Sequence, residues 1–316
     1  MRLSVIVPCY NEETCLPRLR AELLHVLSPL TEEFEVILVD DGSTDDTLGQ
    51  LRAMARADSR FRYLSLSRNF GKESAMLAGL KHAAGDLVAI LDADLQHPPE
   101  LLGDMVALID KGYDQVVARR NRTGDARVRT AASRAYYRMM NRLVDVELTD
   151  GVGDFRLLTR RAVDALLSLE ERNRFSKGLF AWIGFDTAVV DYENVARTDG
   201  DSKWSLRSLV NYGIDGILSF NHQPLRLAMY LGALCTAAAF GYALWLVAGA
   251  LLNGTTAPGY VTIMCGIIGF GGMQLLLVGV LGEYLGRIYQ ETKQRPHFLL
   301  KETSHSVAPE TPCVDD

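Results

Sequence analysis

Residues 86–100 read DLVAILDADLQHPPE. An apolar run of strand length ends in Asp92-Ala93-Asp94, and the prolines that follow suit the start of a helix. Four more apolar runs of strand length lie at 3–8, 34–40, 61–67 and 113–118. Stretches with helical periodicity lie between them, at 44–57, 72–84 and 98–111. This alternation predicts an α/β domain with a mostly parallel, Rossmann-like sheet covered on both faces.

The predicted strands end in acidic residues. Asp40 and Asp41 follow the second strand, and Asp92 and Asp94 follow the fourth. The first strand leads into PCYNEE rather than the glycine-rich turn of a dinucleotide-binding domain, and no Walker A pattern occurs. Because carboxylates repel phosphates unless a divalent cation stands between them, these strand ends indicate a metal site that bridges protein and diphosphate.

Asp92, Asp94 and Gln96 are the candidate ligands of a hard divalent cation. Alternation along a strand would place the two aspartates on one side, and Gln96 can add a carbonyl oxygen two residues further on. The alternative is that the aspartates only cap the helix entered at Pro98.

Composition divides the chain of 316 residues, which is 48% hydrophobic and 23% charged, into two parts. Residues 1–226 have an ordinary soluble mixture, whereas no Asp, Glu, Lys or Arg occurs from Leu227 to Gly282. The uncharged block can hold two membrane spans of about 20 residues but not three. The turn NGTTAPG at Asn253 to Gly259 divides it into expected spans at 227–252 and 260–282. A purely soluble enzyme and a disordered tail protein are both excluded.

Basic residues flank the expected hairpin on both sides. Arg226 precedes the first span, and Arg287, Lys293 and Arg295 follow the second. Because Lys and Arg near span ends favour the cytoplasmic side, we expect both termini in the cytoplasm and the protein in the inner membrane. The tail from Lys301 to Asp316 lacks apolar periodicity, and we expect it to be disordered.

The remaining charge and cysteine patterns fit this location. Eight arginines and one acid lie between Arg119 and Arg142, which favours an amphipathic helix at the membrane surface at 128–146, with a second one at 204–220. The net charge of −6 argues against general nucleic-acid binding. The five cysteines form no C-x-x-C pair and are expected to be free thiols. The predicted organisation is a cytoplasmic α/β domain at 1–200, an interfacial helix at 201–226, a hairpin at 227–286 and a tail at 287–316.

Taken in order, VIVPCYNEE, VDDGSTD, SRNFGKESAMLAGLKHAAGD and LDADLQHPPE resemble the inverting family 2 glycosyltransferases with a GT-A fold. The segments GDFRLLTRRA, ERNRFSKGLFAWIGF, DSKWSL and DGILSFNHQPLRLA, with the hairpin, are similar to the polyprenyl-phosphate glycosyltransferases. That group contains dolichol-phosphate mannose synthase and the bacterial undecaprenyl-phosphate glucosyltransferases. The resemblance implies a nucleoside-diphosphate sugar donor with UDP favoured, Mg²⁺ or Mn²⁺, a polyprenyl phosphate acceptor, and a homo-oligomer with a tetramer as one expectation.

The resemblance also implies residue roles. The nucleotide-sugar positions are Pro8, Tyr10, Glu12, Asp40, Asp41, Asp92, Ala93, Arg120, Arg197 and Lys203. Arg129 and Ser133 match positions near the acceptor phosphate, and Asp92, Asp94 and Gln96 match the metal site. The catalytic candidates are Asp94 and Asp154. A phosphate acceptor is already largely anionic at neutral pH, so Asp154 is expected to orient the acceptor or the sugar, with general-base duty as the alternative.

Two other functions share these features. A processive polysaccharide synthase also joins such a domain to a membrane, but its pore ordinarily needs more spans, and the Q-x-x-R-W pattern is missing here. A non-catalytic membrane scaffold with a degenerate transferase domain is the third reading. The sugar itself stays open, because no local motif reports hydroxyl recognition.

Overall fold

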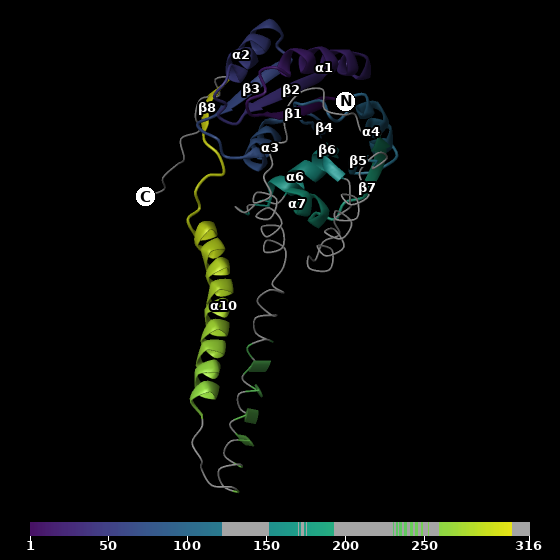
Figure 1. Cartoon of the computed structure of the whole chain (residues 1–316). Coiled ribbons are helices and arrows are strands. Elements are labelled where there is room, and N and C mark those ends of the chain that lie inside the picture. The colour runs from purple at the N-terminus through teal and green to yellow at the C-terminus, as the bar shows by residue number, and fades with distance from the viewer. Residues whose placement is uncertain are drawn as a thin grey trace, which may run out of the picture. The chain divides into compact units, whose positions relative to one another are not determined.

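The computed structural model describes residues 1–121, 152–169, 171, 174, 176–192 and 259–304, with single positions between 230 and 252 (Figure 1). The chain forms two units. The first comprises residues 1–141, 146–205 and 295–316, and the second comprises residues 142–145 and 206–294. The larger unit is therefore interrupted in sequence by the smaller one.

The described elements alternate along the first unit. Its strands are β1 (Leu3–Cys9), β2 (Phe34–Asp40), β3 (Phe61–Leu66), β4 (Leu87–Ile90), β5 (Gln115–Arg120), β6 (Val152–Thr159), β7 (Thr187–Tyr192) and β8 (Leu300–Thr303). Its helices are α1 (Leu16–Leu30), α2 (Thr47–Ala57), α3 (Lys72–His82), α4 (Leu101–Ile109), α6 (Arg160–Leu167) and α7 (Ser176–Trp182). The second unit contains α10 (Tyr260–Thr292).

One mixed sheet holds all eight strands in the order β7-β5-β6-β4-β1-β2-β3-β8. The pairs β1–β2, β1–β4, β2–β3 and β5–β7 are parallel. Two strands run against the others: β6 between β4 and β5, and β8 at the β3 edge. The predicted mostly parallel α/β sheet is confirmed.

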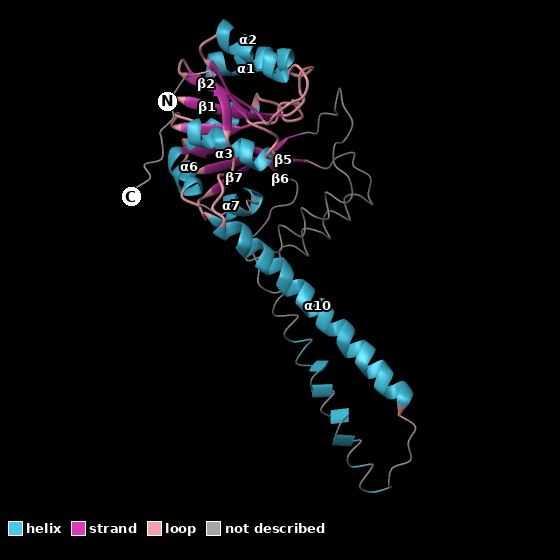
Figure 2. Ribbon diagram, turned by 90° about the vertical axis from the view of Figure 1, so that its left-hand side faces the viewer, coloured by secondary structure: helices cyan, strands magenta, loops and turns pink. Residues whose placement is uncertain are grey.

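Helices cover both faces of this sheet (Figure 2). Leu3, Val5 and Val7 of β1 share one buried cluster with apolar residues of α1, α2 and α4. On the opposite face Ile6 meets α3 so closely that a Cβ on Gly79 would lie 2.2 Å from its Cγ2. Because β1, β2 and β4 are covered on both sides, their sequences are almost continuously apolar rather than alternating.

The antiparallel strand β6 determines which residues meet at the carboxyl edge of the parallel strands. Strands β1, β2 and β4 end at that edge, whereas β6 begins there. Ile90 of β4 pairs with Arg156 of β6, and beyond this pair Lys72 contacts both Asp92, in the loop after β4, and Asp154 of β6. The structure thus joins two aspartates that lie far apart in sequence.

Two predicted boundaries need correction near the acidic motif. The fourth strand ends at Ile90 instead of Asp92, so strand alternation does not orient Asp92 and Asp94. The helix expected from residue 98 begins at Leu101, after a turn in which Leu101 and Leu102 donate to the carbonyl groups of Pro98 and Pro99. Asp92 and Asp94 therefore lie in a loop, and their own side-chain contacts determine where their carboxylates lie.

The prediction of a disordered tail from Lys301 was wrong for its first residues. Residues Leu300–Thr303 form β8, which pairs antiparallel with β3. Arg52 of α2 makes a bidentate ion pair with Glu302, at 2.7 and 2.9 Å. Backbone pairing and one ion pair need no apolar periodicity. The sequence pattern therefore did not indicate this strand. Residues 305–316 lie outside the described residues.

The helix α10 covers Tyr260–Thr292 and includes the second expected span. By a hydropathy criterion, no helix built from described residues has the length and apolar character needed to cross a membrane. The two spans at 227–252 and 260–282 stay predictions.

A buried ion pair stabilises the amino ends of the strands. Glu35 is 4% exposed and accepts hydrogen bonds from Ser4 Oγ at 2.7 Å, Ala84 N at 2.9 Å and Arg62 at 2.6 Å. Burial alone would raise the pKa of Glu35, but these donors outweigh burial and lower it below its ordinary value. Glu35 thus links β1, β2, β3 and the segment before β4.

We predict that Glu35→Ala lowers the free energy of unfolding by about 2 kcal/mol, because it leaves Arg62 and Ser4 without their acceptor. Thermal unfolding of the full chain in detergent measures this, with the exposed Glu33→Ala as the matched control. A carboxyl whose pKa is lowered by folding stabilises the protein above its unfolded pKa and loses that contribution as pH falls. The difference between wild type and variant should therefore shrink below about pH 4. Equal melting temperatures at pH 7 would contradict this assignment.

Candidate functional site

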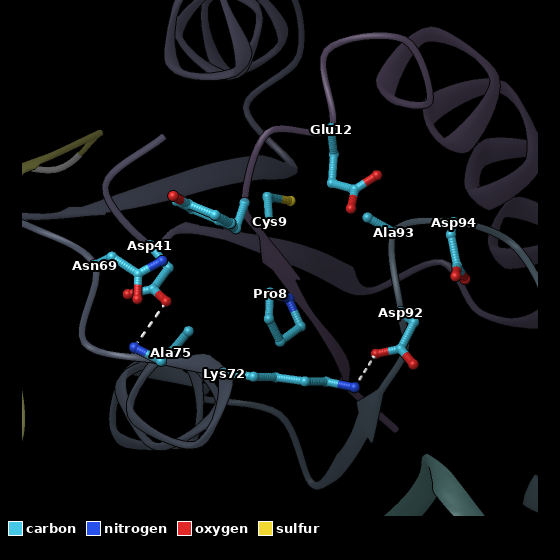
Figure 3. Close-up of a pocket in the computed structure, with 12 residues that line it drawn as sticks. Pro8, Cys9, Glu12, Asp41, Asn69, Lys72, Ala75, Asp92, Ala93 and Asp94 are labelled. Atoms are coloured by element: carbon cyan, nitrogen blue, oxygen red, sulfur yellow. Dashed lines mark hydrogen bonds and ion pairs between the residues drawn. The ribbon is translucent and has the colours of Figure 1, made fainter. Parts of the chain in front are cut away.

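A cavity of about 320 Å³ opens at the carboxyl ends of β1, β2 and β4 (Figure 3). Its wall comes from four chain segments: the ends of β1 and β2, the start of α3 and the loop after β4. The lining residues are Pro8, Cys9, Tyr10, Glu12, Asp41, Asn69, Gly71, Lys72, Ala75, Asp92, Ala93 and Asp94. This is the edge at which ligands of parallel α/β sheets bind.

Most of the residues predicted to bind the nucleotide sugar or the metal line this cavity. Those that line it are Pro8, Tyr10, Glu12, Asp41, Asp92, Ala93 and Asp94. Asp40 is not among them: it is 1% exposed, and its carboxylate accepts from Ser65 Oγ at 2.9 Å and Ser43 N at 3.0 Å. Gln96 does not line the cavity either. The functional roles of these residues stay predictions.

The other predicted residues are placed only in part. The backbone of Arg120 ends β5, beside Tyr192 of β7. Four predicted residues lie outside the described residues: Arg129, Ser133, Arg197 and Lys203. The two expected interfacial helices, at 128–146 and 204–220, also lie outside them.

Two loops brace each other at one side of the cavity. Asn11, in the left-handed region with φ +54°, accepts from Thr44 N at 2.8 Å and donates its own N–H to Ser43 Oγ at 3.0 Å. Glu12 N donates to Thr47 Oγ1 at 2.9 Å, and Asp46 N donates to Glu13 Oε2 at 2.9 Å. The loop that carries Tyr10 and Glu12 is thereby held against the loop after β2 before any ligand binds.

Asp41 shapes the approach to α3. Its two carboxylate oxygens accept the backbone N–H groups of Phe70, at 2.7 Å, and Gly71, at 2.9 Å. Gly71 has φ +94°, a conformation that costs other residues strain, and it directly precedes Lys72. Burial raises the pKa of Asp41 above its ordinary value despite these donors. One role of Asp41 is therefore to fix where the Lys72 side chain starts.

Lys72 connects the acidic loop to β6. Its ammonium nitrogen lies 2.6 Å from Asp92 Oδ1 and 2.5 Å from Asp154 Oδ2. Figure 3 shows the lysine reaching from α3 to Asp92. No local signal could reveal its contacts, because Asp154 is 82 positions away in the chain.

These contacts set the charges of the cluster. Burial alone would lower the pKa of Lys72, but the negative charges of Asp92 and Asp154 raise it far above its ordinary value. Burial would likewise raise the pKa of Asp154, but Lys72 first, and then Lys177 and Arg156, hold it far below the ordinary value. Asp154 is therefore a carboxylate throughout the pH range in which an enzyme is assayed.

Arg156 fixes the backbone beneath Asp154. Its guanidinium donates to the carbonyl oxygens of Gly153, at 3.0 Å, and Asp154, at 3.3 Å. It also stacks 3.5 Å from the ring centroid of Phe180. The position of the Asp154 carboxylate thus depends on a buried arginine as well as on Lys72.

The loop after β4 has an unusual backbone. Leu95, with φ +52°, is a non-glycine residue in the left-handed region, which costs roughly 1–2 kcal/mol. Asp94 Oδ1 accepts the N–H of Gln96 at 3.1 Å across this turn. The turn uses the backbone of Gln96 and directs Asp94 into the cavity.

His97 is a site neighbour that sequence reasoning missed. Its Nε2 lies 3.9 Å from Asp92 Oδ2, and its Nδ1 is hydrogen-bonded to the Tyr192 hydroxyl at the end of β7. Burial lowers the pKa of His97 below its ordinary value. The only local signal was its position one residue after the predicted ligand Gln96.

The donor atoms fit a divalent cation that a substrate helps to hold. Among the described residues, no cluster of three or more His, Cys, Asp or Glu could bind a metal by itself. Asp92 and Asp94 nevertheless line one cavity with hard oxygen donors. Mg²⁺ is usually held by one or two carboxylates, with waters and substrate phosphates completing its shell. Such a shared shell matches the two carboxylates found here.

Comparison with known proteins agrees with this architecture. Residues 4–167 match Glycosyl transferase family 2, and residues 223–288 match the GtrB C-terminal hairpin. The CsbB protein of Bacillus subtilis (strain 168) is 51% identical over 302 residues, which cover 96% of this chain and 92% of CsbB. The bactoprenol glucosyl transferase of Shigella phage SfII is 38% identical over 304 residues, 96% of this chain and 98% of that protein.

A more distant likeness comes from a solved structure. The glucosyl-3-phosphoglycerate synthase from Mycobacterium tuberculosis, in complex with Mn²⁺, UDP-glucose and phosphoglyceric acid, is 23% identical. The TM-score is 0.47, and the match covers 69% of this chain and 77% of that chain. The family match and the nearly full-length relatives are much stronger. They show that this chain belongs to glycosyl transferase family 2 and is a glycosyltransferase.

Proposed function

We propose that the chain transfers a hexose from a nucleoside-diphosphate sugar, with UDP-glucose favoured, to polyprenyl phosphate at the cytoplasmic face of the membrane. The proposal rests on one observation. Asp92 and Asp94 line a single cavity at the strand ends, and the Lys72 ammonium contacts both Asp92 and Asp154. The name of the 38% identical phage relative, a bactoprenol glucosyl transferase, supports both the sugar and a polyprenyl acceptor.

The donor is proposed to bind along the braced loops. Tyr10 offers an aromatic face for a base, and Glu12 and Asp41 offer acceptors beside it. Asp92 and Asp94 would hold Mg²⁺ or Mn²⁺, which would supply Lewis-acid stabilisation of the leaving nucleoside diphosphate. Arg120, Arg197 and Lys203 are proposed to contact the donor as well.

The acceptor brings its own nucleophile. The second pKa of a phosphate monoester is about 6, so at neutral pH an anionic oxygen can attack the anomeric carbon without a base. Direct displacement inverts the configuration at that carbon. Asp154 is proposed to orient the reacting groups, because a carboxylate with a strongly lowered pKa is a poor proton acceptor. Arg129 and Ser133 are proposed to hold the acceptor phosphate.

The membrane location is part of the proposal. The uncharged block from Leu227 to Gly282 and the match to the GtrB C-terminal hairpin support two spans, and the flanking arginines and lysine support cytoplasmic termini. Such an arrangement would bring the cavity close to a lipid acceptor, since the acceptor phosphate stays at the bilayer surface. Self-association, with a tetramer as one form, is proposed from the resemblance alone.

We predict that the purified full chain, mixed with Mg²⁺, undecaprenyl phosphate and radiolabelled UDP-glucose, yields a chloroform-soluble labelled lipid. Omitting undecaprenyl phosphate provides the blank, and the Shigella phage SfII enzyme provides the positive control. A screen of other nucleotide sugars by mass detection of the lipid product then identifies the donor. If no nucleotide sugar gives lipid-linked product while the phage enzyme does, the proposed function is wrong.

We predict that Asp94→Asn lowers the metal-dependent kcat by at least about 100-fold, because an amide neither carries the charge nor holds the ion as a carboxylate does. The exposed Asp104→Asn on α4 is the matched control and should retain wild-type turnover. Rates are measured across a Mg²⁺ titration, so that weakened metal binding is separated from lost chemistry. Unchanged turnover at every Mg²⁺ concentration would remove Asp94 from the metal site.

The Asp154→Asn variant distinguishes orientation from general-base duty. We predict that kcat falls about 100-fold with little change in the donor KM, since a misplaced reacting group slows the reaction without weakening donor binding. The acid limb of the kcat profile should stay near pH 6 in both proteins, because the acceptor phosphate and not Asp154 titrates there. Asp164→Asn on α6 serves as the control. An acid limb that disappears in Asp154→Asn would instead make Asp154 the base.

A further inference from the structure

The Lys72 ammonium lies between two carboxylates whose negative charge a metal ion could otherwise neutralise. It lies within 2.6 Å of an oxygen of Asp92, a proposed metal ligand, and within 2.5 Å of an oxygen of Asp154. Asp92 retains 26% side-chain exposure and Asp154 retains 20%, so water screens these carboxylates only in part. Without a cation between them, the two carboxylates would repel each other.

The backbone holds this lysine in place. Lys72 is the first residue of α3, and the two preceding N–H groups are both bonded to Asp41. The aliphatic part of the side chain passes along the cavity that also exposes Asp92 and Asp94. The loop that Asp41 holds therefore positions the ammonium group beside the two carboxylates.

We propose that Lys72 is an internal counter-ion that competes with the divalent cation for Asp92, so that the metal binds well only together with the donor diphosphate. This inference rests on the proposed metal site. Lys72 donates to Asp92 Oδ1 at 2.6 Å, and a divalent cation at Asp92 and Asp94 has to share or take over that oxygen. Lys72 retains Asp154 as its second partner, so it stays next to the reacting groups.

Charge balance explains the coupling to the donor. Lys72 already compensates part of the negative charge, so a bare divalent cation arriving at the site meets a repelling ammonium group. A nucleoside diphosphate brings negative charge of its own and restores the attraction for both cations. Lys72 is thus a positioning residue that sets the order in which metal and donor bind.

The experiment measures Mn²⁺ binding to the full chain in detergent by electron paramagnetic resonance, without nucleotide and then with UDP. We predict that Lys72→Met binds Mn²⁺ alone about tenfold more tightly than wild type, comparable to the effect of one nearby charge on an ionic equilibrium. With UDP present the difference should narrow. Lys72→Arg, which keeps the charge, should bind Mn²⁺ alone within about twofold of wild type.

Two further variants complete the design. Lys111→Met, at an exposed lysine after α4, is the matched control and should leave Mn²⁺ binding unchanged. Lys72→Gln removes the charge but keeps hydrogen-bonding groups, and it takes the place of Lys72→Met if that variant does not fold by circular dichroism. Mn²⁺ affinity without nucleotide that stays equal or falls in the folded neutral variant would overturn the inference.

The Asp94→Asn variant separates this failure from failure of the proposed function. If wild type binds Mn²⁺ with UDP and Asp94→Asn does not, the metal site stands, and the Lys72 variants decide the inference alone. If Asp94→Asn binds Mn²⁺ with UDP as wild type does, the metal site itself is wrong, and the inference falls with it.

Discussion

The pairing of β6 against the direction of its neighbours is the constraint on which the site depends. A parallel sheet brings only strand ends to its carboxyl edge, whereas an antiparallel strand contributes its beginning there. Residues from both ends of strands can then meet, as Asp92 and Asp154 do across Lys72. A one-residue slip in this register would turn Asp154 to the other face of the sheet and leave the lysine with one partner.

Around that constraint the protein assembles most of the cavity before substrate arrives. The loops after β1 and β2 bond to each other, Asp41 holds the start of α3, and Arg156 holds the backbone beneath Asp154. Binding energy from a donor is then not spent on ordering these segments. The positive φ of Leu95 fits the same pattern, because strain beside Asp94 persists only where surrounding contacts enforce it.

The sequence predicted the parallel part of the fold well, because β1, β2 and β4 are buried on both faces and therefore appear as apolar runs between turns. It did not predict β6 or β7, whose places in the sheet depend on pairing with distant strands. The acidic motif was found because Asp92 and Asp94 are near each other in sequence. The roles of Lys72 and His97 in the site were not found from the sequence, because their partners come from other segments of the chain. Asp40 and Asp41 show the same limit: adjacent residues point to different surroundings, and only Asp41 reaches the cavity.

The strand β8 has a consequence for how the catalytic unit can be studied. It follows α10 in the chain and pairs with β3, so the sheet is completed only after α10 has been synthesised. A fragment that stops before the hairpin would leave the hydrogen-bonding groups of β3 open along one edge, and bare edges invite association between molecules. A fragment truncated before the hairpin would therefore lack β8 and have an incomplete sheet.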